Sequence, residues 1–181
     1  MLTARTLAEA EVYLSVMAAA DDAPDATEPP EVTVTEGEDA WTVASGAGEV
    51  QVLYRTEEEA RRVGVRFGLG NSLLLDAGAW VQLASLWARR ALDADIEYTG
   101  QPGQNRQKVE LNWEFARDAM EEALKFLPDG ADVVPDEGFW TELGIRTQQQ
   151  SPELFTRAKL TEDHEFYREQ LDAFRALYGE N

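Results

Sequence analysis

The single histidine and the carboxylates of this chain are the side chains that could perform acid–base chemistry. His164 stands between Asp163 and Glu165. A catalytic triad needs a histidine held beside a nucleophile and an orienting acid, whereas a histidine flanked by acids in the first turn of a predicted helix is typical of the protein surface. The sequence contains no cysteine. It therefore offers no thiolate nucleophile, and one histidine supplies a transition-metal site poorly.

Several neighbouring acids could bind Ca²⁺ or Mg²⁺, which take oxygen ligands. The candidates are Asp21, Asp22, Asp25, Asp93 and Asp95. None stands in the register of an EF-hand loop, which carries a central glycine and a closing glutamate. A glycosidase would need two carboxylates facing each other across a sugar, and no pair stands out among so many acids. We therefore predict no metal, no cofactor and no catalytic residue.

Gly68 and Gly70 are spaced like the opening of a phosphate-binding loop. Leu73 stands where the third glycine of that pattern would be, and the Gly-Lys-Ser/Thr ending of a P-loop is missing. The predicted role of the two glycines is turn geometry. The densest basic positions are Arg61, Arg62 and Arg66, with Arg89 and Arg90 further on. These arginines could meet an anion at this turn, but we favour pairing with the acids at 57–59 or solvation on a helix face.

The acidic excess is concentrated near the N-terminus. The whole chain has 35 acids against 16 bases, a net charge of -19. Residues 1–60 hold 14 acids and two bases, and the stretch from Asp21 to Asp39 holds eight acids and no base. Such a field repels nucleic acid and anionic membranes and attracts a basic partner. An acidic surface also serves solubility in a high-salt cytoplasm, but solubility gives no reason to concentrate charge near one end.

The segments that would direct the chain to a membrane or out of the cell are not predicted. Glu9 and Glu11 interrupt the apolar stretch of the first 20 residues, which a secretory signal does not tolerate. No apolar run approaches the ~18 residues of a transmembrane helix. Together with the lack of cysteine, this predicts a cytoplasmic protein.

Apolar periodicity predicts an α+β fold in a single domain over residues 1–181. Between residues 31 and 54, three runs of alternating apolar and polar residues are separated by glycine-containing turns. This pattern predicts a small N-terminal antiparallel sheet of about three strands with one face buried. Its alternating apolar residues are Val32, Val34, Trp41, Val43, Val50 and Val52. We expect the sheet to pack on a mainly helical remainder of five to six helices, with an acidic, proline-rich loop at about 21–30.

Helices are predicted where a capping residue precedes apolar residues at helical spacing. The capping residues are Thr6, Thr56, Asp76, Asp136, Ser151 and Thr161. The predicted helices cover residues 6–20, 57–67, 77–92 and 107–127, short segments after 136 and 151, and residues 162–178. The fourth helix could instead begin at Asn112 after a short strand, because Val109 and Leu111 alternate with polar residues.

In overall character the chain resembles the immunity proteins of bacterial toxin–immunity pairs. The resemblance rests on the acids from Asp21 to Asp39, the capped helices and the lack of catalytic motifs. It implies a non-catalytic protein that inhibits a basic partner, such as a toxin domain, by covering its active site. Where the toxin is a nuclease, an acidic face would imitate substrate phosphates. The implied contact residues are Asp21, Asp22, Asp25, Glu28, Glu36, Glu38 and Asp39, with Trp41 as an aromatic anchor.

Two other classes stay open. A secretion or assembly chaperone would need a large exposed apolar groove. An enzyme or ligand-binding domain without a recognisable motif would need a deep pocket with converging polar groups. Trp140, beside Phe139 on a short predicted helix, is the tryptophan that we expect to be exposed to a partner. The oligomeric state is not predicted.

Overall fold

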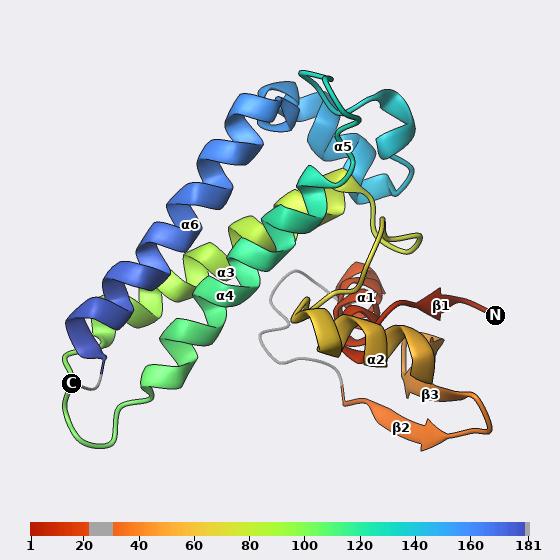
Figure 1. The fold of residues 1–181 in the computed structure, drawn as a ribbon, viewed down its shortest axis with the longest axis horizontal. Helices are drawn as coiled ribbons and strands as arrows, with labels where there is room; N and C mark the ends of the chain where they lie inside the picture. The colour runs from red at the N-terminus through yellow and green to blue at the C-terminus, as the bar shows by residue number, and fades with distance from the viewer. Residues whose placement is uncertain (22–30, 180–181) are drawn as a thin grey trace. The chain divides into compact units, whose positions relative to one another are not determined.

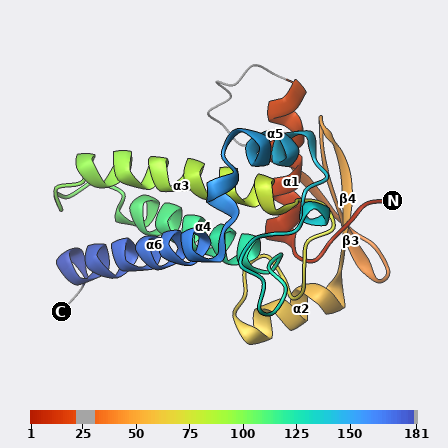
Figure 2. The ribbon, with the colours of Figure 1, turned by 90° about the horizontal axis from the view of Figure 1, so that it is seen from above.

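The alternating segment forms an antiparallel meander. In the computed structural model, which describes residues 1–21 and 31–179, the strands are β2 (Thr33–Glu36), β3 (Ala40–Ser45) and β4 (Gly48–Leu53) (Figures 1 and 2). A two-residue strand, β1 (Thr3–Ala4), pairs in parallel with β4, so that the order is β1-β4-β3-β2. The α+β prediction is confirmed, with four strands rather than three. The fourth strand was missed because two residues are too short to show alternation.

Helix α1 (Leu7–Asp21) covers the middle of this sheet rather than its whole face. Val43 and Val50 are paired across β3 and β4, and both are completely buried, as is Val52. By contrast, all four residues of β2 are exposed, and Val34 keeps 47% of its surface in solvent. The prediction that β2 would bury its valine was therefore wrong. The reason is that α1 packs on β3 and β4, and β2 lies beyond this contact.

The start of α1 is held by a buried carboxylate. The hydroxyl of Thr6 accepts a hydrogen bond from the N–H of Glu9 at 3.1 Å, which confirms the predicted N-cap. The Glu9 carboxylate is 1% exposed and accepts from the N–H of Arg5 at 2.7 Å and from its guanidinium. That guanidinium also donates to the carbonyl of Gly70. The glycine turn thus has Arg5 as one of its partners, a residue that the sequence did not suggest for it.

A second buried carboxylate reaches the same helix end from α2 (Tyr54–Val63). Glu57 accepts from the N–H of Leu7 and from Arg61 Nε, both at 2.8 Å. An acid at this place satisfies a helix-end donor and complements the helix dipole. We call Arg5, Thr6, Glu9, Glu57 and Arg61 the polar network. It joins β1, α1 and α2, and it confirms that Arg61 pairs with a local acid.

The bounds predicted for α2 need correction. The helix begins three residues earlier than expected and ends at Gly64, which adopts the left-handed conformation with φ 76°. Thr56 is therefore not the N-cap, and its hydroxyl donates to the carbonyl of Leu53 within the first turn. The left-handed glycine ends the helix well short of Phe67.

The chain forms two compact units, Met1–Leu75 and Asp76–Asn181, and a single domain over residues 1–181 stays a prediction. The second unit is helical: α3 (Ala77–Glu97), α4 (Arg106–Leu124), α5 (Glu142–Gln150) and α6 (Arg157–Tyr178), with short 3₁₀ turns at Asp136–Gly138 and Pro152–Phe155. Helix α4 packs on α3 and on α6 (Figure 2). The core between them includes the fully buried Trp80 and Trp113.

Two of the four α-helix starts in this unit agree with the sequence. Asp76 and Asn105 cap α3 and α4, which excludes a start of α4 at Asn112. Two starts were wrong. Thr156, not Thr161, caps α6, and Thr141, not Asp136, caps α5, because Asp136 opens only a 3₁₀ turn. Each true cap is a threonine whose hydroxyl accepts a hydrogen bond from the backbone N–H three residues later. In both cases the sequence analysis chose another residue that could also cap a helix.

Asp76 also has a second role inside this unit. One carboxylate oxygen accepts from the N–H of Ala79 at 2.9 Å, and the other accepts from Trp140 and Thr141 at 2.7 and 2.6 Å. The side chain is fully buried and ties the start of α3 to the segment before α5.

None of the helices in the described part of the chain has the length and apolarity that crossing a bilayer requires.

Candidate functional site

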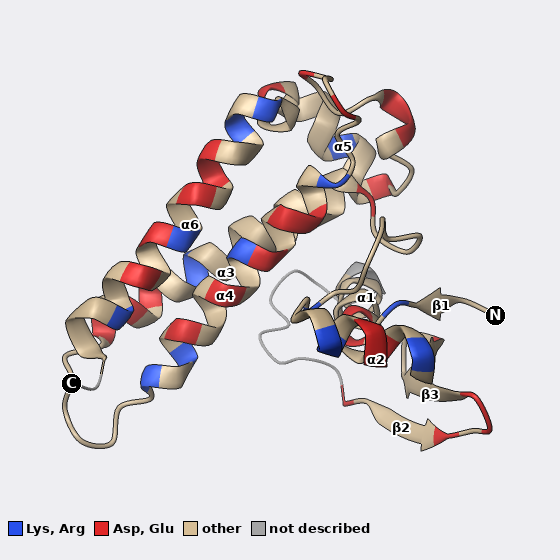
Figure 3. Cartoon of the chain, in the orientation of Figure 1, with Lys and Arg blue, Asp and Glu red and all other residues tan. Residues whose placement is uncertain are grey.

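Four acids and no base lie in the segment that comprises β2, β3, the turn between them and the two residues before β2. We call residues 31–45 the acidic hairpin; its acids are Glu31, Glu36, Glu38 and Asp39, and all four are exposed. Figure 3 shows them before β2, at its end and in the turn. Among the residues that the structure describes, no ion pair involves Glu36, Glu38 or Asp39. Their negative charge is therefore not locally neutralised.

The turn of the acidic hairpin is fixed from outside by one tyrosine. The N–H of Gly37 donates to the carbonyl of Ala40 at 2.9 Å, which closes a two-residue loop of Glu38 and Asp39. Tyr54, the first residue of α2, donates its hydroxyl to the carbonyl of Gly37 at 2.7 Å and its N–H to the carbonyl of Asp39 at 3.1 Å. The two loop acids are thus presented on a backbone that is held on both sides.

Trp41 lies next to the acids, as the sequence suggested, but it is partly packed. It stands opposite Glu36 in the β2–β3 register. Its ring meets that of Tyr54 edge to face, with centroids 4.3 Å apart and an interplanar angle of 80°. Trp41 is half-buried. Such a ring is held in one orientation while part of it stays available for contact.

The predicted contact residues divide into two groups. Glu36, Glu38, Asp39 and Trp41 come together in the acidic hairpin. Asp22, Asp25 and Glu28 lie outside the described residues, and Asp21 closes α1, with nothing described of its side chain. Sequence reasoning passed over Glu31, although it belongs to the same acidic run, and Tyr54, whose only signal is an aromatic residue directly after a predicted strand.

Several acids of the helical unit have basic partners. Arg106 Nε lies 2.6 Å from Glu110, and Arg175 lies 2.5 Å from Glu114 and 3.4 Å from Glu110. Arg117 with Asp118 and Lys159 with Asp163 are each 2.6 Å apart. Arg175 links α6 to α4, and the other pairs join near neighbours on one helix, so each of these acids has a base beside it. The acidic hairpin differs in having no base within its own sequence.

His164 lies in the interior of α6 rather than in its first turn, because that helix begins at Arg157. The imidazole is half-buried, and this burial lowers its pKa. The charged groups that act on it are Glu121, Arg168, Arg117 and Asp118. The histidine is thus neutral at neutral pH and faces acids and arginines, which suits a helix-packing position.

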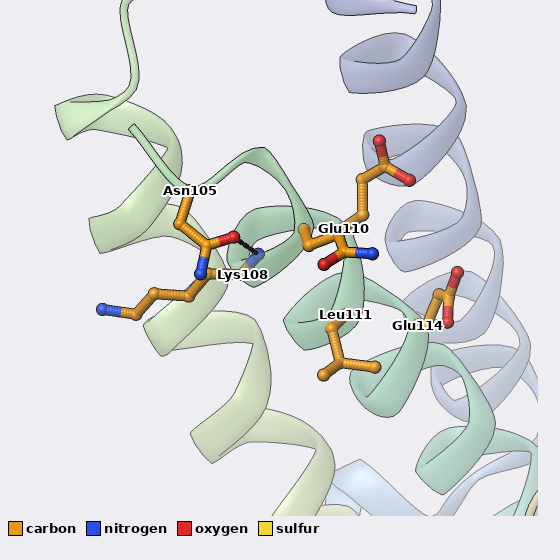
Figure 4. Close-up of a pocket in the computed structure, with 6 residues that line it drawn as sticks. Asn105, Lys108, Glu110, Leu111 and Glu114 are labelled. Atoms are coloured by element: carbon orange, nitrogen blue, oxygen red, sulfur yellow. Dashed lines mark hydrogen bonds between the residues drawn. The ribbon is translucent and has the colours of Figure 1, made fainter. Parts of the chain in front are cut away.

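A pocket of about 500 Å³ lies at the start of α4. It is lined by Asn105, Gln107, Lys108, Glu110, Leu111 and Glu114. Figure 4 shows Lys108 pointing away from Glu110 and Glu114. Both carboxylates are held by arginine, and the lining residues belong to one helix and its cap. The pocket therefore lacks the converging polar groups on which a catalytic or ligand-binding proposal would rest.

Within residues 1–21 and 31–179, no three His, Cys, Asp or Glu side chains are grouped as metal ligands would be.

Comparison with protein family models, curated proteins and solved structures finds no significant match to this chain.

Proposed function

We propose that this protein is a non-catalytic binding protein that recognises a basic protein partner through the acidic hairpin. One observation carries the proposal: Glu36, Glu38 and Asp39 are exposed on one pinned hairpin that contains no base. Unpaired acids on an ordered surface give a directed negative field, which steers a basic partner during encounter. Charges that are already paired, such as those of Glu110 with Arg106 and Glu114 with Arg175, give little such field.

The hairpin also offers what a stable complex needs beyond charge. The backbone of the loop is held by Tyr54, so that little backbone entropy is lost when a partner binds. The partly exposed ring of Trp41 beside Glu36 supplies aromatic surface of the kind that dominates binding energy at interfaces. The acids at 21–28, which the structure does not describe, extend the same negative run in the sequence.

The partner that suits this surface best is a basic toxin domain, so that the protein would act as an immunity protein. The resemblance of the chain to such proteins supports this, as does the charge pattern of the acidic hairpin. Inhibition would be steric and electrostatic: the acids would occupy the basic groups that otherwise hold a substrate phosphate. The cysteine-free composition supports action in the cytoplasm.

The test compares two variants with the same change in net charge. Glu36→Gln, Glu38→Gln and Asp39→Asn together neutralise the acidic hairpin. Glu165→Gln, Glu169→Gln and Asp172→Asn together neutralise three exposed acids of α6. Each variant and the original protein serve as bait in a lysate of the source cells, and the association rate of the retained basic protein is then measured.

We expect the hairpin variant to associate about tenfold more slowly at low salt, and the difference to shrink at high salt as the charges are screened. The α6 variant should stay close to the original protein. An equal loss in both variants would show that only net charge matters, and retention of no basic protein at either salt concentration would contradict the proposal.

A further inference from the structure

The outer edge of β2 is one of the two edges of the sheet. In the order β1-β4-β3-β2, strand β2 is terminal, and among the described strands it pairs with β3 alone. All four of its residues are exposed. A strand edge carries a row of backbone donors and acceptors, which is the template that strand addition uses.

The register identifies the backbone groups on this edge. The bonded pair of Gly37 and Ala40 fixes the alternation of the antiparallel ladder. Counting back along the register, Thr35 opposite Thr42 is again a hydrogen-bonded position, as is Thr33. The alternate residues, one between Thr33 and Thr35 and one between Thr35 and Gly37, direct their N–H and C=O groups away from β3. These are Val34 and Glu36.

We propose that the outer edge of β2 binds an extended basic segment of the partner protein as a fifth strand. This inference rests on the proposed function and adds the mode of recognition. Val34 and Glu36 are two residues apart, so their side chains lie on one face of the strand. The incoming segment should place an apolar residue beside Val34 and a lysine or arginine beside Glu36, in alternation.

Charge complementarity selects a foreign segment over a second copy of this chain. If two β2 edges paired, the acids of one hairpin would lie beside those of the other, and like charges across strands are destabilising. A basic segment places opposite charges at the same positions. The exposed Val34 then gains apolar contact that the sheet itself does not provide.

The experiment follows amide hydrogen exchange by NMR in the full chain. The probe is the acetylated and amidated peptide Lys-Thr-Val-Thr-Lys-Thr-Val, and its glutamate counterpart is the control. We expect the lysine peptide to slow exchange at the amides of Val34 and Glu36 by about tenfold or more, because they become hydrogen-bonded. The glutamate peptide should have no effect.

Two variants separate the backbone from the side chain. Val34→Pro removes the outward N–H, and proline is tolerated there because that N–H is not used by the β2–β3 ladder. Val34→Ala shortens the side chain but keeps the N–H. We expect the proline variant to lose the protection of Glu36 and the alanine variant to keep it. Equal protection in both variants would overturn strand addition.

The remaining outcomes distinguish the two proposals. Peptide-induced shifts at Glu38 and Asp39 without slower exchange at Val34 and Glu36 would overturn strand addition while the acidic hairpin stays a binding surface. Slow exchange at both amides without peptide, in a protein that sediments as a dimer, would overturn it in favour of a second copy. No response to the lysine peptide combined with no basic partner from lysate would overturn both proposals.

Discussion

In the polar network, the carboxylates of Glu9 and Glu57 are buried and accept hydrogen bonds from Arg5, Leu7 and Arg61. The acids of the acidic hairpin instead face solvent, and the hairpin contains no lysine or arginine. Both regions belong to the unit Met1–Leu75. They contain the same residue types and differ in the donors that surround them. Burial with donors makes a carboxylate part of the fold, and exposure without bases leaves its field for another molecule.

This difference also separates what each region can tolerate. Removing one partner of a buried ion pair leaves an uncompensated charge away from water, which is costly. Removing an exposed charge changes little in the folded state. Substitutions that neutralise one acid in each region therefore test whether the comparison is correct.

The largest effect is expected at Glu9. Glu9→Gln keeps the shape of the side chain but removes the carboxylate that pairs with the guanidinium of Arg5. The Arg5 side chain is only 14% exposed, so its charge would lose this partner away from water. We expect the free energy of unfolding to fall by about 3 kcal/mol. Urea denaturation followed by circular dichroism measures it. Glu38→Gln in the acidic hairpin is the matched control, with a change of under about 0.5 kcal/mol expected. Similar losses of stability in both variants would show that the buried acids contribute no more to the fold than the exposed acids of the acidic hairpin.

A smaller effect is expected at Gly68, where no charge is altered. Its φ of 107° disfavours any side chain, and a Cβ there would lie 2.5 Å from the Cβ of Arg5. Gly68→Ala should therefore displace Arg5 from Glu9 and destabilise the protein by about 2 kcal/mol in the same urea assay. Gly46→Ala meets no atom within 4 Å and should change stability by less than about 0.5 kcal/mol. If Gly68→Ala is as stable as the original protein, the polar network does not depend on this close approach.

Local signals in the sequence predicted those parts of the fold that depend on neighbouring residues. The alternation at 31–54 predicted three strands, and capping residues such as Thr6 and Asp76 predicted helix starts, because both patterns are set within a few positions. The exposure of Val34 could not be predicted in this way, since it depends on how far α1 reaches across the sheet. The parallel pairing of β1 with β4 joins segments almost 50 residues apart and leaves no local pattern.

The candidate site shows the same limit. The acid run from Asp21 to Asp39 pointed to Glu36, Glu38 and Asp39 because charge is visible in a sequence. The roles of Glu9 and Glu57 were not visible, since an acid that accepts from Arg5 or Leu7 looks like any other acid until the donors are placed. Tyr54 likewise gains its role only when the hairpin turn folds back onto it.

The smallest effect concerns an acid beside the polar network. Glu11 is an exposed residue, but partial desolvation of its carboxylate, and next the charge of Glu57, raise its pKa above the ordinary value of 4.5. Between that value and the raised pKa the folded state binds more protons, so stability falls as pH rises through this window. Glu11→Gln should therefore raise Tm slightly at neutral pH, and the gain should vanish below pH 4.5, where both forms are uncharged. Calorimetry across pH measures this, with Glu38→Gln as the control. A lower Tm for Glu11→Gln at neutral pH would mean that Glu11 also accepts stabilising hydrogen bonds in the polar network. Three carboxylates of this region, rather than Glu9 and Glu57 alone, would then stabilise the fold, whereas those of the acidic hairpin do not.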